Sequence, residues 1–207
     1  MKEQSLNTEG LILKAAEEMF LKKGYAATKT TEIAKQAGIT HAMLHYYFRT
    51  KENLFNIIFQ NKVKLMVSSF FSVSNSDMPF LEIIGNTVGR HFDFIRANPI
   101  LPLFIINEMN NNEKNGKVWK DLALPFFRDV IKTMNTMFAK EIEKGTIRNI
   151  EAVDFVLNTI SLNIFVFIAQ PIIKDLKKME DDDNGYEEFL NKRKEENIRL
   201  ALLSLQP

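Results

Sequence analysis

The sequence of 207 residues contains no cysteine, which excludes disulfide bonds, thiolate nucleophiles and cysteine-ligated zinc sites. It has only eight glycines and six prolines, against 17 phenylalanines and nine methionines. Because turn-rich β folds need many glycines and prolines, this balance favours helices. The expected fold class is all-α, and a chain without cysteine fits a reducing cytoplasm.

Long apolar runs are also missing. The most apolar stretch, residues 160–173, includes Ser161, Asn163 and Gln170 and is shorter than the roughly 20 residues of a membrane span. The polar start, MKEQSLNTEG, lacks the apolar core of a signal peptide. We therefore expect a cytoplasmic protein with no membrane partner.

An excess of one charge is lacking as well, since the net charge is only +1. Residues 1–51 hold eight Lys/Arg and five Asp/Glu, a balance of +3, which leaves 19 and 21, or −2, for the remainder. An asymmetry of this size is weak support for a polyanionic partner. The partner has to be inferred from the arrangement of side chains.

The first fifty residues show the periodicity of three short helices. Apolar residues recur at spacings of three and four over residues 8–23. A second helix is expected to begin with Thr30 as its N-cap, and a third at His41 with Thr40 as its N-cap. Gly38 between them predicts a tight turn, so residues 1–49 are expected to form a small N-terminal domain.

The third of these helices, HAMLHYYF, has more aromatic side chains than one buried face can hold. At about 100° per residue, Leu44 and Phe48 lie together and are expected to face the core. The outward arc is expected to carry Ala42, Met43, His45 and Tyr46, flanked by His41 and Tyr47. Such a row is costly to leave exposed unless a partner docks there.

Two short helices joined by a glycine turn match a helix-turn-helix, whose second helix enters the DNA major groove. The threonines at the helix N-termini, and the tyrosines and Lys51 at the rims, can hold phosphate oxygens. The side chains between them can approach base edges, by apolar contact with thymine methyl groups and by one hydrogen bond from His45. The expected DNA-binding residues are Thr30, Thr40, His41, Ala42, Met43, His45, Tyr46, Tyr47 and Lys51.

The segment GYAATKTTEIAKQAGITHAMLHYYFRTKENLF resembles the N-terminal helix-turn-helix of the tetracycline-repressor (TetR) family of bacterial regulators. The segment combines several short motifs of that family, namely Gly-aromatic, Thr, IA..AG, L..YF and KE.L. The combination is far more specific for the family than any one of these motifs. The chain departs from the family at His41 and Ala42, where members often carry Lys-Gly or a similar pair, and at His45, where Tyr is common. Base preference and pH dependence therefore cannot be transferred from relatives.

This resemblance implies a homodimer, with a four-helix bundle formed by the last two long helices of each copy, and a ligand pocket among the middle helices. It also implies repression that the ligand relieves. We expect a homodimeric regulator, a repressor, bound to an inverted-repeat operator in double-stranded DNA and released by a small hydrophobic ligand. The expected domains are the helix-turn-helix at residues 1–49 and a larger helical domain for ligand binding and dimerisation at residues 50–207. About nine helices are expected in the two domains together.

The remainder of the chain is expected to be helical too, with Asn98 and Asn149 as N-caps of two of its helices. Helices are predicted at residues 51–72, 76–97, 98–109, within 118–144, at 150–170 and at 186–205. The helix at 150–170 is apolar around most of its circumference, which favours burial against a second copy. The expected dimer interface comprises Phe155, Leu162, Val166, Ile198, Leu202 and Leu205.

The phenylalanines and methionines of the middle helices favour a hydrophobic or aromatic ligand, although most of them are expected to be core residues. His91 is equally compatible with a pocket and with a core histidine bonded to a backbone carbonyl. Glu108, near the end of its helix, can contact a polar end of a ligand. The candidate ligand-binding residues are Phe59, Met66, Phe70, His91, Phe94, Phe104, Asn107, Phe127 and Met134.

Other chemistries have less support. His41 and His45 have a spacing that can bind zinc, but no third ligand is evident, and Asp181–Asp183 match a solvated turn better than a calcium loop. No nucleophile with a base, carboxylate pair or phosphate-binding glycine loop is found, so we expect no enzyme, metal or cofactor. The rival function is an apolar-ligand carrier or sensor with a vestigial helix-turn-helix, which would lack salt-dependent DNA binding.

Overall fold

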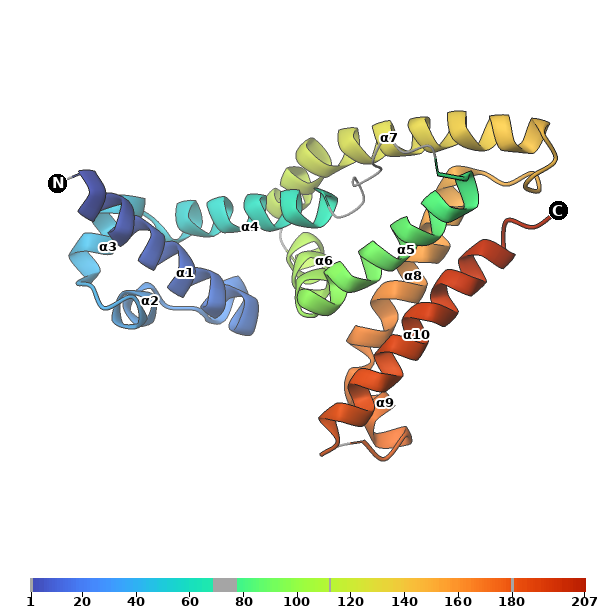
Figure 1. The fold of residues 1–207 in the computed structure, drawn as a ribbon. Helices are drawn as coiled ribbons and strands as arrows, with labels where there is room; N and C mark the ends of the chain where they lie inside the picture. The colour runs from blue at the N-terminus through green and yellow to red at the C-terminus, as the bar shows by residue number, and fades with distance from the viewer. Residues whose placement is uncertain (1, 69–77, 112, 180) are drawn as a thin grey trace. The chain divides into compact units, whose positions relative to one another are not determined.

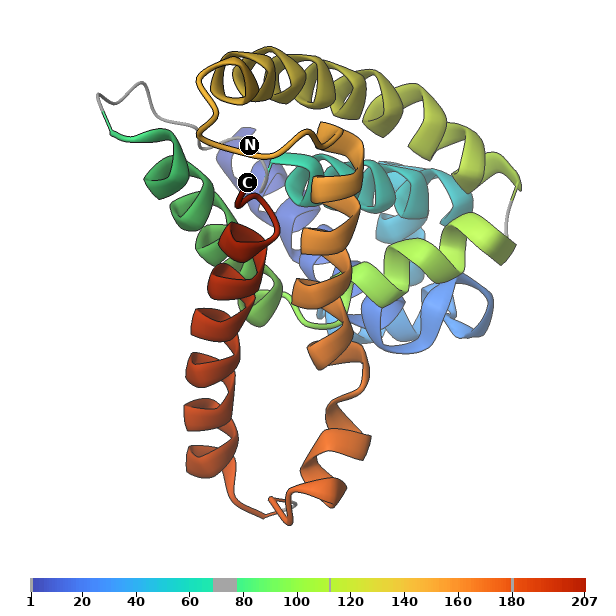
Figure 2. The same cartoon turned by 90° about the vertical axis from the view of Figure 1, so that its right-hand side faces the viewer.

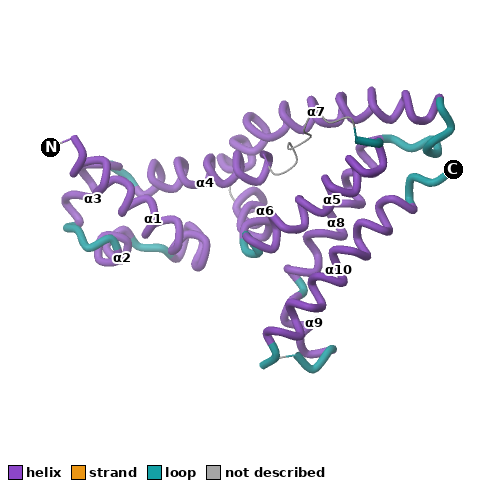
Figure 3. Tube along the Cα trace, viewed as in Figure 1, coloured by secondary structure: helices purple, strands orange, loops and turns teal. Residues whose placement is uncertain are grey.

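The computed structural model describes residues 2–68, 78–111, 113–179 and 181–207. Within these ranges the chain consists of helices and connecting loops and has no strand (Figure 3), which confirms the all-α class. The helices are α1 (Lys2–Ala27), α2 (Thr30–Gln36), α3 (His41–Phe48), α4 (Lys51–Ser68), α5 (Phe80–Ala97), α6 (Leu101–Asn111), α7 (Glu113–Glu143), α8 (Ala152–Ile168), α9 (Gln170–Leu176) and α10 (Asp183–Leu203).

The described residues form ten helices where about nine were expected, because a short additional helix, α9, follows the helix predicted at residues 150–170. α8 ends at Ile168, and the short helix α9 follows with Pro171 in its first turn. Proline has no backbone N–H and cannot continue the hydrogen-bond ladder of the preceding helix. The two helices bend by 68° at this break.

The N-caps predicted at Asn98 and Asn149 are both wrong. Asn98 ends α5 instead of beginning α6, because its backbone N–H donates to the Ile95 carbonyl and its side chain donates to the Phe94 carbonyl. The cap residue of α8 is Glu151 rather than Asn149, and its side chain makes no capping bond. Residues 69–77, where two predicted helices were to end and begin, lie outside the described residues.

The chain forms two compact units. Unit 1 comprises residues 1–65 and 103–123, and unit 2 comprises residues 66–102 and 124–207. The two units therefore divide within α4, α6 and α7. The boundary between a DNA-binding domain and a ligand-binding domain, expected between residues 49 and 50, is a different division and stays a prediction.

Unit 1 is held together by an aromatic core. Phe20 of α1 meets Phe55 of α4 edge-on, with ring centroids 5.0 Å apart. Phe104 of α6 lies 6.1 Å from both Phe55 and Phe59, so α6 packs in the same unit as the N-terminal helices. α2 contacts α1 and α3, which completes this unit.

Unit 2 is built on α5, α8 and α10, which pack on one another (Figures 1 and 2). Gly89 allows α10 to approach α5, because a Cβ at this position would lie 3.2 Å from Ile198 and 3.3 Å from Lys194. Phe138 and Phe155 are at the centre of one core cluster, and Phe92 belongs to a second. Among the described residues, no single helix has the length and apolarity of a membrane span, although α8 and α9 together pass that test.

Candidate functional site

The turn between α2 and α3 has the geometry that the sequence predicts for a helix-turn-helix. Gly38 has a φ of +69°, a conformation that favours glycine, and the N–H of Ile39 donates to the Ala34 carbonyl at 3.0 Å to close the turn. The Thr40 hydroxyl accepts a hydrogen bond from the Met43 N–H at 3.2 Å, so the predicted N-cap of α3 is confirmed.

Thr30 differs from its predicted role. The N-cap of α2 is Lys29, whose side chain makes no capping bond, and Thr30 is the first residue of the helix. Its hydroxyl instead lies 3.0 Å from Nε2 of His41. The first turns of α2 and α3 are therefore joined by a side-chain hydrogen bond.

α3 presents its predicted face outward. Leu44 and Phe48 are 1% and 2% exposed, whereas Tyr46 is 81% exposed and Met43 is 39% exposed. The exposed residues also include Ala42 and both histidines, and Tyr47 is partly buried beside them. The rings of His41 and His45 meet edge-on at 5.6 Å, and those of Tyr46 and Tyr47 at 5.4 Å.

Lys51, expected at the rim, is held against the protein. Its ammonium lies 4.4 Å from the centre of the Tyr25 ring and donates to the Ala26 carbonyl at 3.4 Å. Burial lowers the pKa of Lys51, and the negative charge of Glu108 opposes that shift. The side chain is partly exposed, so its phosphate contact stays a prediction.

Two exposed cations were not among the expected DNA contacts. Lys29 is the N-cap of α2, and Arg49 is the C-cap of α3 with a φ of +60°. Lysine and arginine at the ends of a recognition helix and its neighbour are common phosphate contacts. Lys29 precedes the predicted cap Thr30, and Arg49 follows the last residue of the predicted third helix, and these positions were the available sequence signal.

The candidate ligand residues are divided between the two units. Phe59 and Phe104 are in the core of unit 1, where Asn107 is exposed. The candidates in unit 2 are the buried Met66 and His91 and the partly buried Phe94, Phe127 and Met134. Phe70 lies outside the described residues.

His91 belongs to a buried polar cluster that joins α5, α8 and α10. Its Nδ1 lies 3.0 Å from the side-chain nitrogen of Asn163, which also donates to the Val88 carbonyl at 3.0 Å. The side chain of Asn197 donates to that of Asn163 at 2.9 Å. Burial lowers the pKa of His91 from 6.5 to about 4, so the ring is neutral near pH 7.

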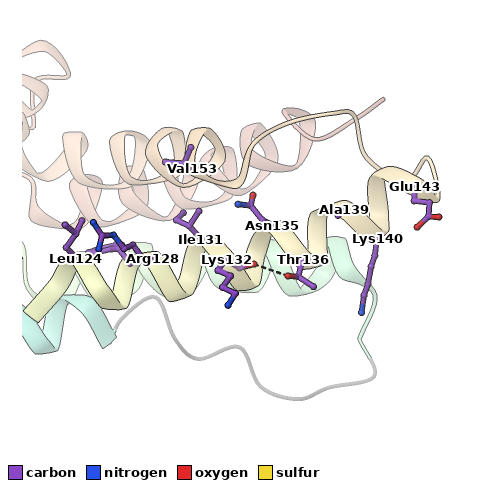
Figure 4. A pocket seen from close by; sticks show the side chains of 11 residues that line it. Leu124, Arg128, Ile131, Lys132, Asn135, Thr136, Ala139, Lys140, Glu143 and Val153 are labelled. Atoms are coloured by element: carbon purple, nitrogen blue, oxygen red, sulfur yellow. Dashed lines mark hydrogen bonds between the residues drawn. The ribbon is translucent and has the colours of Figure 1, made fainter.

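A groove of about 960 Å³ runs along α7 in unit 2. Its apolar lining comes from Leu124, Phe127, Ile131, Ala139 and Val153. Figure 4 shows Ile131 pointing toward the helix that carries Val153, while Lys132 and Lys140 point to the other side of α7. Of the candidate ligand residues, Phe127 lines this groove.

The expected dimer residues have mixed positions. Phe155, Val166 and Leu205 are buried in the core of a single chain, at 4%, 4% and 0% exposure. The other three, Leu162, Ile198 and Leu202, are partly buried. The exposed apolar side chains of α8 are different residues, namely Val153, Leu157, Phe165 and Ile168.

Among the described residues, no group of three histidine, aspartate or glutamate side chains is placed to hold a metal ion. His41 and His45 lie together on α3 as a pair. The two rings contact each other, and His41 also contacts Thr30.

Comparison with known proteins identifies the N-terminal module. Residues 12–58 match the family described as bacterial regulatory proteins, tetR family. The HTH-type transcriptional regulator QacR of Staphylococcus aureus is 48% identical over 50 residues, which span 24% of this chain and 27% of that regulator. The fatty acid metabolism regulator protein of Bacillus subtilis is 20% identical over 137 residues, 66% of this chain and 69% of that protein.

The fold extends the similarity to the whole chain. A crystal structure of a TetR family transcription regulator from Marinobacter aquaeolei superposes with a TM-score of 0.60, covering 99% of this chain and 98% of the other, at 16% identity. The predicted resemblance to the TetR family is thereby confirmed, by sequence in the N-terminal module and by fold throughout. These relatives are transcriptional regulators, and they support a function as a DNA-binding regulator for this chain.

Proposed function

We propose that this TetR-family protein is a homodimeric transcriptional repressor that binds an inverted-repeat operator in the cytoplasm and leaves it when a small hydrophobic ligand binds. The observation that carries the proposal is the outward face of α3. Two buried anchors, Leu44 and Phe48, fix the orientation of this helix, and the Thr40 cap fixes its start. The remaining side chains are free to meet a major groove.

We assign the contacts by position on this face. We propose that Met43, Ala42 and His45 reach base edges and that Tyr46 and Tyr47 reach phosphates at the rim. Lys29 and Arg49 add positive charge at the helix ends, and Thr40 offers the N-terminus of α3 to a phosphate oxygen. Every phosphate that is neutralised in this way contributes to a steep loss of affinity with salt.

The dimer is supported by an apolar stripe on α8. Val153, Leu157, Phe165 and Ile168 recur at helical spacing, and Leu157 and Phe165 are 56% and 67% exposed. A row of large apolar side chains is a surface that a partner normally covers. We propose that a second copy covers it, with Leu162, Ile198 and Leu202 at its edge, which brings two α3 helices to two half-sites.

The ligand proposal rests on the groove along α7. Its apolar lining suits a hydrocarbon body, and Arg128 at its edge suits an acidic group. Because one relative is named for the regulation of fatty acid metabolism, a long-chain fatty acid is the first effector to test. Direct binding to the protein, and release from the operator, are the two measurements required.

The deciding experiment is the selection of bound fragments from a randomised double-stranded DNA library at two salt concentrations. A dimeric regulator enriches an inverted repeat, and the enrichment weakens steeply as salt rises. Enrichment of a single half-site would contradict the dimer. No enrichment at either salt would favour the rival function, a carrier or sensor of apolar ligands with a vestigial helix-turn-helix.

A further inference from the structure

α1 is broken at Gly24, near its C-terminal end. Gly24 has φ +74° and ψ 174°, outside the helical region, although a helical turn resumes after it. The break takes the N–H of Tyr25 out of the α1 ladder, and a partly buried N–H needs another acceptor. That acceptor is Oε1 of Glu108 on α6, at 3.0 Å and 83 residues along the chain.

The break is shaped to receive this carboxylate. A Cβ at position 24 would lie 3.4 Å from the same Glu108 oxygen, and the positive φ independently favours glycine there. The Thr28 hydroxyl donates to the Gly24 carbonyl at 2.8 Å, which holds the other side of the break. The N–H of Tyr25 is thus presented to α6 by a fixed backbone.

Three helices of unit 1 meet at Glu108. The Tyr25 ring contacts the Phe55 ring of α4, with centroids 4.9 Å apart, and the ammonium of Lys51 lies 4.4 Å from its centre. The charge of Glu108 acts on Lys51, which begins α4 directly after the recognition helix. One turn earlier on α6, Phe104 packs against Phe55, so the same face of α6 makes a polar and an apolar contact.

We propose that Glu108 is a positioning residue that ties α6 to the DNA-binding helices, so that a displacement of α6 passes to α1 and α4 through its carboxylate. This rests on the proposed function and names the residue that couples operator binding to the rest of the chain. A helix shift of about 1–2 Å is enough to break a hydrogen bond of this length. α6 is placed to shift because it follows α5 of unit 2 and leads into α7, which returns to unit 2.

The test is amide hydrogen exchange on the full-length protein, with and without the operator obtained by selection. Coupling is reciprocal, so operator bound at α3 must slow exchange at Tyr25 and in α6 of the wild type. Glu108→Ala removes the acceptor; exchange at Tyr25 is expected to rise by roughly tenfold or more, and the response of α6 to operator is expected to disappear. Glu108→Gln keeps a neutral acceptor, and its exchange rate at Tyr25 is expected to lie between those of the wild type and Glu108→Ala.

Glu113→Gln is the matched control, because it removes an exposed carboxylate at the start of α7 and leaves Tyr25 untouched. If Glu108→Ala does not fold, the Glu108→Gln protein decides. A wild type that binds operator with no change in α6, or a Glu108→Ala protein whose α6 responds as in the wild type, overturns the role of Glu108 alone. A wild type that binds no operator at any salt overturns the proposed function, and the coupling falls with it.

Discussion

Acidification is expected to destabilise the fold through His91. This side chain is 1% exposed in the core formed by α5, α8 and α10, and burial lowers its pKa from 6.5 to about 4. In the folded protein the ring therefore stays neutral over a range in which the unfolded chain takes up a proton. Its contribution to stability is complete above pH 6.5 and is lost as the pH falls toward 4.

The size of this loss follows from proton linkage between the two pKa values. It amounts to about 2 kcal/mol at pH 5 and about 3 kcal/mol at pH 4, relative to pH 8. For a chain of this length, a loss of about 2 kcal/mol lowers Tm by roughly 4–8 °C. Carboxylates titrate mainly below pH 5, so the window between pH 7 and pH 5 isolates histidine.

The assay is urea unfolding at pH 8, 7, 6 and 5, comparing the wild type with His91→Asn. Asparagine can keep an acceptor near the Nδ1 position toward Asn163, and it does not titrate. We expect His91→Asn to lose stability at every pH but to lack the wild-type decline of about 2 kcal/mol between pH 8 and pH 5. His45→Asn, an exposed control on α3, is expected to keep that decline. A His91→Asn protein with the wild-type slope would refute the reasoning.

Three further predictions concern the recognition helix and the proposed dimer. Tyr46→Phe removes one exposed hydroxyl and is expected to weaken operator affinity, measured by fluorescence anisotropy, by roughly threefold to tenfold. Tm is expected to stay unchanged, and Glu188→Gln, at an exposed position on α10, is the control. Thr40→Ala removes the cap of α3 and is expected to cost about 1 kcal/mol in thermal unfolding, whereas Thr40→Ser is expected to be nearly neutral. Phe165→Glu places a charge on the apolar stripe of α8 and is expected to give a monomer in sedimentation velocity, whereas Lys192→Glu on α10 is expected to leave a dimer.

Each of these has a contradicting result. If Tyr46→Phe binds the operator as tightly as the wild type, the Tyr46 hydroxyl makes no phosphate contact. If Thr40→Ala and Thr40→Ser are equally stable, the Thr40 cap contributes nothing to stability. A wild-type monomer at micromolar concentration would leave the exposed stripe on α8 without the proposed partner.

The sequence alone determined the features that depend on residues close together in the chain. Leu44 and Phe48, four residues apart, specify which face of α3 is buried, and Thr40 caps the helix three residues before the N–H it satisfies. Gly38 supplies the turn conformation. These local rules were sufficient to predict the helix-turn-helix and its outward face.

The tertiary structure decided what local periodicity leaves open. α8 is apolar around most of its circumference, so its sequence could not separate Phe155, which is buried, from Phe165, which is exposed. The bond from Tyr25 to Glu108 joins positions 83 residues apart, and His91 and Asn163 are 72 residues apart. Such pairs form only when packing brings distant helices together, because no local preference of either residue specifies its partner.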